Sequence, residues 1–307
     1  MPIVRFCWFG ADRMVKVCRP YYRLLCVWIG PYMHRPHDRF LDKFSPVWYS
    51  GDKIFEKDVR DMKFRAHRGH AACPENTMPA FIKAFEDGFE QIETDPQITK
   101  DGVIVLMHDY TINRTCRNRD GSPIERKILI KESTYEELLA YDAGIAFGEE
   151  FRGTCIPRLE ELLELLDGSD VLLDLDKKIP TDELDVLLEL VSRYNVCVEF
   201  SCGDTERIKK ILSRCPNALI NYDGHTTEEI LSAICALVPR DQLIVWMYYD
   251  NPHFAWLTDR YKTSPENCAR VKKYARLGIA NILNTYEMRD AIRWGADVIE
   301  PFDLQQH

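Results

Sequence analysis

The sequence predicts an α/β protein built as one (β/α)8, or TIM, barrel, with an N-terminal extension and a small insertion after the second strand. Eight strand-like segments alternate with helical patterns from Phe64 onward, which is typical of a closed parallel barrel. The roughly 240 residues of this part match one such barrel, which needs about 250. Charged residues stand at the ends of the first strands, where these barrels keep their functional side chains. We therefore divide the chain into an extension, 1–60, and a barrel, 61–307.

The positions of the strands and helices follow from the spacing of apolar residues and from the turn residues between them. The predicted strands cover residues 64–69, 89–95, 171–177, 196–202, 218–224, 243–249, 279–285 and 296–302. The clearest predicted helices cover residues 157–167, 182–194, 226–238 and 264–277. A further helix is indicated by apolar residues at i, i+3, i+4 and i+7 from Met78.

The first strand ends in a group of polar residues. It runs from Phe64 into His67, Arg68 and His70, and Pro74 stops any continuation. A guanidinium can hold two phosphate oxygens through its planar fork. An imidazole, with an ordinary pKa of about 6.5, can exchange a proton near neutral pH. This strand end therefore offers a phosphate ligand and an acid or base.

The second strand carries two carboxylates that must point to the same face. Glu93 and Asp95 are two residues apart, and side chains alternate along a strand. Two such charges repel unless a cation lies between them, and their hard oxygens suit Mg²⁺ or Ca²⁺. A turn at Gly102 then brings His108 back on a second extended run, as in a hairpin. Residues 110–156 are too many for a simple loop and are predicted to form an insertion over the strand ends.

The third strand, VLLDLDKK (171–178), repeats the two-residue spacing with Asp174 and Asp176. Charges in a buried strand are costly unless they are paired or bind a metal. Each signal alone has an ordinary interpretation: a single histidine is usually solvated or hydrogen-bonded, and an E-x-D is usually surface charge. Their joint occurrence at the ends of consecutive strands indicates an active site.

Several motifs resemble the glycerophosphodiester phosphodiesterase family. They are HRG, PENT, E-T-D, KDGVIVLMHD, INRT and YDAGIAFGEEFRGTCIPRLEELLELL, in that order. The match is dense from about Phe64 to Leu166 and sparse afterwards. The resemblance implies a (β/α)8 barrel, one divalent cation, and hydrolysis of glycerophosphodiesters to an alcohol and glycerol 3-phosphate. It also implies attack by a hydroxyl of the substrate's own glycerol, giving a cyclic phosphate that water opens.

The resemblance assigns roles to particular residues. Glu93, Asp95 and Asp174 would bind Mg²⁺ or Ca²⁺, Asp174 being matched to the third-strand acid of the family. Arg68 would bind the phosphate, and the histidines, His67 and His108, would share the roles of general acid and general base. The sequence does not say which histidine is the acid. Two further residues, Glu75 and Asn76, would either shape the loop by hydrogen bonds or supply an oxygen ligand.

Three stretches depart from the family pattern. Asp176 stands where the family has a lysine, so it is either an additional metal ligand or a solvated residue, and Lys177 or Lys178 would have to supply the lost cation. NILNTYE (281–287) replaces a W-T-x-N motif, and Glu300-Pro301 replaces T-D. The family's tryptophan is therefore absent, and the aromatic residues that could replace it are Trp246 and Tyr248.

Composition limits the partners and the compartment. The net charge of −9 argues against nucleic acid as a partner. Eleven scattered cysteines without a C-x-x-C pair indicate reduced thiols and a cytoplasmic protein. No run of 18 apolar residues is present, so no transmembrane helix is expected. A small-molecule glycerophosphodiester or lysolipid is the expected partner.

The extension differs from the barrel because its first 40 residues carry seven lysines and arginines against two aspartates, interleaved with aromatic residues. One interpretation is structural: the segment packs on the barrel as a cap, since the chain stops directly after the last predicted strand. The other is a peripheral contact with an anionic membrane surface. Truncation separates them, because only the cap is needed for folding.

Two other functions compete with glycerophosphodiester hydrolysis. A lysophospholipase D or sphingomyelinase D-like barrel would also use two histidines and a divalent ion, and would release choline from lysolipids. A non-catalytic barrel that binds phosphodiesters is the alternative from a different class, supported by the altered third-strand and C-terminal motifs.

Overall fold

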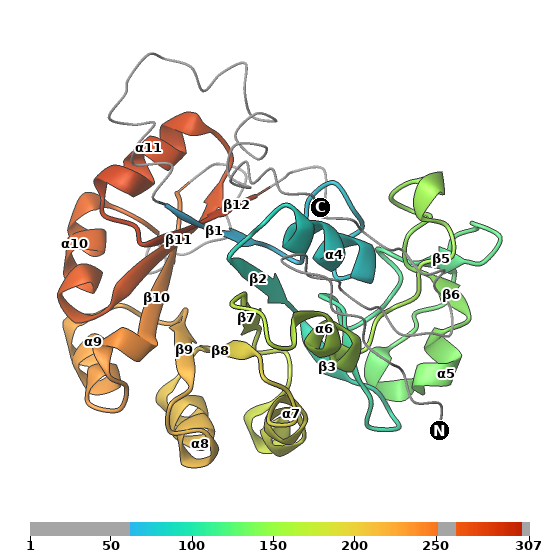
Figure 1. Ribbon diagram of the computed structural model, residues 1–307, viewed down its shortest axis with the longest axis horizontal. Helices are drawn as coiled ribbons and strands as arrows, with labels where there is room; N and C mark the ends of the chain where they lie inside the picture. The colour runs from blue at the N-terminus through green and yellow to red at the C-terminus, as the bar shows by residue number, and fades with distance from the viewer. Residues whose placement is uncertain (1–61, 251–261, 303–307) are drawn as a thin grey trace, which may run out of the picture.

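Eight parallel strands close into a barrel in a computed structural model, which describes residues 62–250 and 262–302 (Figure 1). The order around the barrel is β1-β12-β11-β10-β9-β8-β7-β2. The strands are β1 (Lys63–Ala66), β2 (Gln91–Thr94), β7 (Leu172–Leu175), β8 (Cys197–Cys202), β9 (Leu219–Tyr222), β10 (Leu243–Tyr248), β11 (Arg276–Ile282) and β12 (Val298–Pro301). The predicted (β/α)8 barrel is confirmed. Both interpretations of the N-terminal extension fall outside the described residues.

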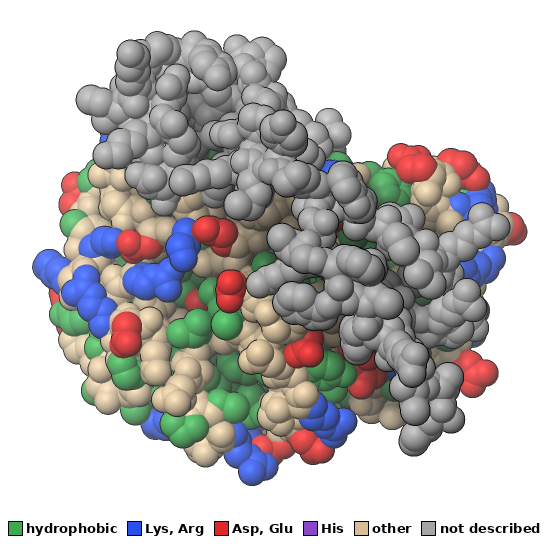
Figure 2. Space-filling model, in the orientation of Figure 1, with side chains coloured by type: hydrophobic (Ala, Val, Ile, Leu, Met, Phe, Trp, Pro, Cys, Tyr) green, Lys and Arg blue, Asp and Glu red, His purple; other side chains and the backbone are tan. Residues whose placement is uncertain are grey.

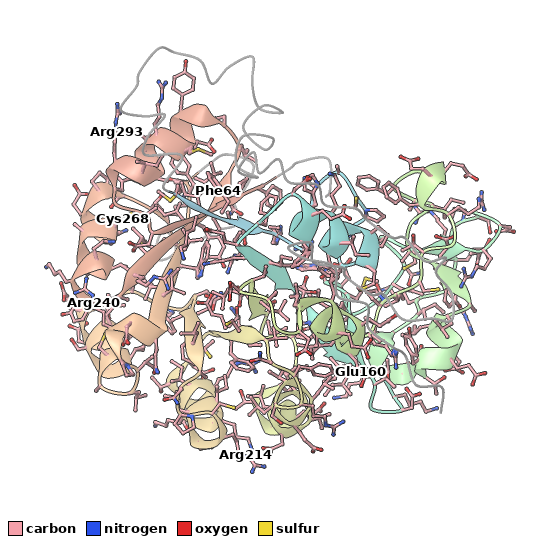
Figure 3. The ribbon with its side chains drawn as sticks, viewed as in Figure 1. Phe64, Glu160, Arg214, Arg240, Cys268 and Arg293 are labelled. Atoms are coloured by element: carbon pink, nitrogen blue, oxygen red, sulfur yellow. The ribbon has the colours of Figure 1, made fainter. Side chains whose placement is uncertain are left out.

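Helices surround the barrel and bury their apolar stripes against it (Figure 1). They are α4 (Met78–Glu86), α6 (Leu159–Leu166), α7 (Leu184–Val191), α8 (Thr205–Arg214), α9 (Glu228–Cys235), α10 (Pro265–Tyr274) and α11 (Thr285–Arg293). Figure 2 shows charged side chains of both signs on the outer surface of the described residues. Arg214 and Arg293 lie at this periphery in Figure 3, whereas Cys268 on α10 is fully buried. No helix among the described residues is both long and apolar enough to span a bilayer.

The two faces of each strand contact different parts of the protein, because successive side chains along a strand point to opposite faces. On β10, Leu243, Val245 and Met247 point outward into the main core between strands and helices. Ile244 and Trp246 point inward, where they form a small apolar cluster with residues of β11 and β12. The interior of the barrel is otherwise rich in buried polar residues, and these form the site described below.

The predicted boundaries are wrong around β11. The helix predicted to reach 277 ends at Tyr274, and the strand predicted at 279–285 covers Arg276–Ile282. Asn284 explains why β11 ends at Ile282. Its side chain accepts hydrogen bonds from the backbone N–H groups of Tyr286 and Glu287 and so begins α11. The strand prediction had run past this cap into the helix.

The insertion after β2 is a small unit with its own core. The hairpin β3 (Pro96–Ile98) and β4 (Ile104–Leu106) is antiparallel, as predicted for the run that ends at His108. Beyond it lie β5 (Arg117–Asn118), α5 (Tyr135–Leu138) and β6 (Tyr141–Asp142), beside the barrel in Figure 1. Apolar residues of this segment form a separate cluster that includes Val105, Met107, Ile112, Ile130, Leu138 and Ile156.

Gly69, the glycine of the HRG motif, is expected to be costly to replace. Its φ is +87°, and a Cβ would lie 2.7 Å from the Cβ of Ala80. Gly102 is the matched control, since its φ is +83° but a Cβ would meet no atom within 4 Å. Gly102→Ala should lower the free energy of unfolding by about 1–2 kcal/mol through the backbone alone. Gly69→Ala should cost about 1–3 kcal/mol more, through overpacking. Urea denaturation measures both, and equal losses would contradict the expected clash.

Candidate active site

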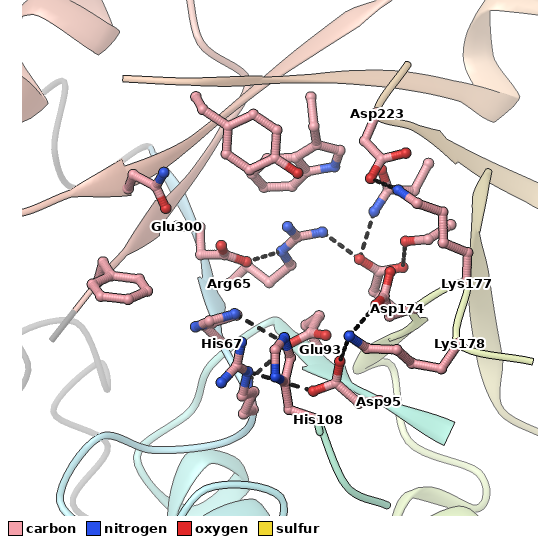
Figure 4. Close-up of a pocket in the computed structure, with 18 residues that line it drawn as sticks. Arg65, His67, Glu93, Asp95, His108, Asp174, Lys177, Lys178, Asp223 and Glu300 are labelled. Carbon is pink, nitrogen blue, oxygen red and sulfur yellow. Dashed lines mark hydrogen bonds and ion pairs between the residues drawn. The ribbon is translucent and has the colours of Figure 1, made fainter. Parts of the chain in front are cut away.

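A pocket of about 620 Å³ opens at the carboxyl ends of the barrel strands, a volume that suits a small molecule (Figure 4). The sequence-predicted residues that line it are His67, Arg68, Glu93, Asp95, His108, Asp174, Asp176, Lys177, Lys178, Trp246 and Tyr248. The pocket is also lined by Arg65, Ser201, Asn221, Asp223, Asn281, Glu300 and Phe302. Residues far apart in the sequence thus converge on one cavity, as the strand-end argument predicted.

The two carboxylates of the second strand are buried next to each other. One oxygen of Glu93 accepts the backbone N–H of Arg68 at 2.9 Å and lies 4.0 Å from Nε2 of His67. Asp95 accepts a hydrogen bond from the Asn76 side chain at 2.8 Å. Burial, followed by repulsion from Asp95, raises the pKa of Glu93 well above its ordinary value. Burial and the like charge of Asp95 thus both disfavour the ionised form of Glu93, an effect that a bound cation would oppose.

Glu75 and Asn76 are absent from the pocket lining and lie behind it. The amide of Asn76 donates to Asp95 and accepts from the hydroxyl of Thr94 at 2.7 Å, which fixes the Asp95 carboxylate. Glu75 accepts hydrogen bonds from Arg68 at 3.2 Å and from Arg114 at 2.6 Å. These four hydrogen bonds agree with the loop-shaping alternative for Glu75 and Asn76.

The imidazole of His108 contacts the carboxylate of Asp109, a residue that was not predicted from the sequence. Nδ1 of His108 lies 2.7 Å from Asp109, whose other oxygen accepts from Nε of Arg114 at 2.8 Å. Burial opposes ionisation of Asp109, but hydrogen bonds from Arg114 and His108 lower its pKa to about 2. A carboxylate that stays charged fixes the orientation of an imidazole that it contacts. Arg114 belongs to the INRT motif, yet its partner could not be identified without the fold.

Asp174 is tied into a buried network around Arg65, another residue that the sequence reading missed. The guanidinium of Arg65 donates to Asp174 and, at 2.6 Å, to Glu300 (Figure 4). It also stacks on Trp246, 3.4 Å from the ring centroid. Burial raises the pKa of Asp174 to about 6, opposed by the charge of Arg65. The period-two rule could have found Arg65, because it lies two residues before His67 on the same strand face.

The two lysines after Asp176 take different partners. Lys177 pairs with Asp223. Lys178 reaches the pocket, with Nζ 3.6 Å from Asp95 and 3.7 Å from Asp176. Burial opposes ionisation of Asp176, but the neighbouring lysines lower its pKa. Lys178 therefore places a cation next to Asp176, the residue at the family's lysine position.

The donor set suits a hard cation, although it is not arranged around one. Glu93 and Asp95 are buried carboxylates whose pKa values are raised, first by burial. Among the described residues, Oδ1 of Asp174 accepts a hydrogen bond only from Ser201, at 3.1 Å, which leaves a lone pair for a ligand. Across residues 62–250 and 262–302, no three His, Cys, Asp or Glu side chains are grouped as a metal site.

The family model described as "Glycerophosphoryl diester phosphodiesterase family" matches residues 67–213. This segment runs from His67 through the insertion and the Asp174 strand to α8. Residues 67–213 belong to the glycerophosphoryl diester phosphodiesterase family. The family assignment expected from the sequence motifs is therefore confirmed.

Individual relatives point to the same phosphodiesterase family. A glycerophosphodiester phosphodiesterase of Caldanaerobacter subterraneus is 45% identical over 136 residues, which are 42% of this chain and 52% of the relative. A glycerophosphodiester phosphodiesterase of Bacillus altitudinis is 47% identical over 105 residues, which are 34% of this chain and 40% of the relative. The chain thus spans about half the length of these relatives.

Solved structures share the fold. A phosphodiesterase of Oleispira antarctica, in complex with the product sn-glycerol-3-phosphate, superposes with a TM-score of 0.65 at 19% identity, covering 78% of this chain and 92% of that one. A glycerophosphoryl diester phosphodiesterase of Parabacteroides distasonis superposes with a TM-score of 0.61 at 23% identity, covering 78% of this chain and 83% of that one. At this identity the likeness supports the barrel fold alone.

Proposed function

We propose that the protein hydrolyses glycerophosphodiesters to an alcohol and glycerol 3-phosphate. The observation that carries this proposal is the convergence of His67, His108, Arg68 and the paired carboxylates of β2 on one pocket. A phosphodiester needs compensation of its negative charge, a base for the nucleophile and an acid for the leaving alkoxide. The product complex of the Oleispira antarctica neighbour agrees with this substrate class.

The cationic side chains would hold the phosphate. Arg68 enters the pocket from the end of β1, where its guanidinium lies 3.2 Å from Glu75, which orients it. Lys178 reaches the same region from the end of β7. A divalent cation, Mg²⁺ or Ca²⁺, would be held by Glu93, Asp95 and Asp174, and would supply charge neutralisation and a lower pKa for a bound hydroxyl.

The two histidines would divide the proton transfers. His67 is packed on Phe302, with ring centroids 5.6 Å apart, and its Nε2 faces Glu93. His108 is oriented by Asp109 and stays partly accessible from the pocket. One imidazole takes the proton of the attacking hydroxyl, and the other protonates the departing alkoxide.

Cation binding is expected to stabilise the folded protein, because it relieves the repulsion between Glu93 and Asp95. At a concentration one hundred times Kd, Mg²⁺ or Ca²⁺ should add about 2.7 kcal/mol to the free energy of unfolding and raise Tm. Asp95→Asn should lose this shift. Asp185→Asn, which alters an exposed carboxylate on α7, should keep it. An equal shift in both variants would place the cation elsewhere.

Product analysis separates the three candidate functions. The full chain is incubated with Mg²⁺ or Ca²⁺ and either glycerophosphocholine or lysophosphatidylcholine, and the products are identified by mass spectrometry. Glycerol 3-phosphate and choline from glycerophosphocholine support the proposal. Choline from lysophosphatidylcholine alone would favour the lysophospholipase D-like alternative. Binding of either compound without any product would favour the phosphodiester-binding barrel.

A further inference from the structure

β11 contains an irregularity that turns one polar side chain into the pocket. Ile279 and Ile282 both point outward into the main core, although a regular strand would place them on opposite faces. The register with β12 shifts between these two residues. Asn281 lies in the shift with a φ of +64°. As a consequence, Ala280 and Asn281 both face the inside of the barrel, and Asn281 lines the pocket. Bulges next to active sites often redirect a side chain in this way.

The buried amide nitrogen of Asn281 lacks a hydrogen-bond partner within the described chain. Only 6% of the residue is exposed, and its Nδ2 donates to no atom there. A left-handed backbone at a residue other than glycine is itself unfavourable, and an unsatisfied buried donor adds to the cost. Both features are explained if the amide donates to an oxygen of a bound ligand.

Within the part of the chain that the structure describes, two more polar atoms of this pocket have no hydrogen-bond partner, and they lie on neighbouring strands. Nε1 of Trp246, on β10, is a buried donor, and Oδ1 of Asn221, on β9, is a buried acceptor. Nδ2 of Asn221 is already used, since it donates to Asp174 at 2.6 Å. Two donors and one acceptor match hydroxyl groups, which both accept and donate. A quaternary ammonium group could satisfy none of these atoms, because it has neither a lone pair nor an N–H.

The barrel order places this group away from the paired carboxylates. Between β11 and β2 lie β12 and β1 on one side, and β10, β9, β8 and β7 on the other. If the glycerol hydroxyl is activated near Glu93 and Asp95, the opposite ester branch extends toward β11. We propose that Asn281, with Trp246 and Asn221, forms a subsite for a hydroxyl-bearing leaving alcohol and makes Asn281 a specificity-determining residue. This inference rests on the proposed function and explains the NILNTYE stretch, which begins with Asn281.

The test compares substrates that share glycerol 3-phosphate and differ in the alcohol. Glycerophosphoglycerol offers hydroxyl groups to the subsite, and glycerophosphocholine offers none. Asn281→Gly removes the amide while keeping a residue that tolerates positive φ, so the backbone is not strained. The variant should lower kcat/KM for glycerophosphoglycerol by about ten-fold, the effect of one lost hydrogen bond. For glycerophosphocholine, kcat/KM should change by less than about two-fold.

A binding measurement separates this inference from the proposed function. Calorimetry on His67→Ala protein, with and without Asn281→Gly, should show weaker binding of glycerophosphoglycerol and unchanged binding of glycerophosphocholine in the double variant. This selective loss supports the subsite even if no diester is hydrolysed, an outcome that would overturn only the proposed function. Equal losses for both diesters, or no loss for either, overturn the subsite whether or not turnover occurs. Tm of each variant is measured alongside, so that unfolding is not mistaken for lost binding.

Discussion

His67→Ala is expected to lower kcat for glycerophosphodiester hydrolysis by about a hundred- to ten-thousand-fold, the usual contribution of one general acid or base. His67 ends the first strand beside Glu93 and lines the pocket. Alanine removes the imidazole and leaves the cation ligands in place. Because the loss affects proton transfer, KM should change little compared with kcat. Steady-state kinetics on glycerophosphocholine measures both quantities.

His225→Ala is the matched control for this variant, since His225 does not line the pocket. Its kcat should stay within about two-fold of the wild type, in the ordinary range for residues outside a site. A similar loss in both variants would show that the His67 effect is a general loss of structure. An active His67→Ala protein would exclude this imidazole from the chemistry.

Arg65→Met is expected to lower the free energy of unfolding by about 3–5 kcal/mol, the cost of breaking a buried ion pair from one side. Arg65 is almost fully buried and contacts the carboxylates of Asp174 and Glu300. Its removal leaves both of these groups without their guanidinium. Methionine keeps a similar length and preserves packing on Trp246. Urea denaturation at neutral pH gives the loss directly.

Two further variants test the charge argument for Arg65. Arg65→Met combined with Glu300→Gln should be more stable than Arg65→Met alone, because one uncompensated charge is gone. Arg293→Met, which alters an arginine whose side chain is 75% exposed, should change stability by less than about 0.5 kcal/mol. A double variant no more stable than Arg65→Met would show that the loss comes from packing and not from charge.

Much of the site could be predicted because side chains along a strand point alternately to its two faces. The two-residue spacing predicted that Glu93 shares a face with Asp95, and Asp174 with Asp176, and all four line the pocket. The same rule applies to Arg65, but an arginine in a short strand gives no sign of which carboxylates it will meet. Its partners come from strands more than 100 residues away in the sequence.

Other parts of the site depend on irregular structure that no periodicity encodes. The bulge in β11 reverses the expected direction of Asn281, so alternation would have assigned it to the outer face. The contact of Arg114 with both Asp109 and Glu75 depends on how the insertion is placed against the first loop of the barrel. The presence of Asp176 at the family's lysine position could be seen in the sequence. The approach of Lys178 to Asp95 could be identified only from the fold.

The most direct test of the central claim is the release of glycerol 3-phosphate by the 307-residue chain from glycerophosphodiesters in Mg²⁺ or Ca²⁺, compared with the same reaction in EDTA. We expect glycerol 3-phosphate and the alcohol in equal amounts with a cation, and neither product in EDTA. No glycerol 3-phosphate from any diester with either cation would contradict the account.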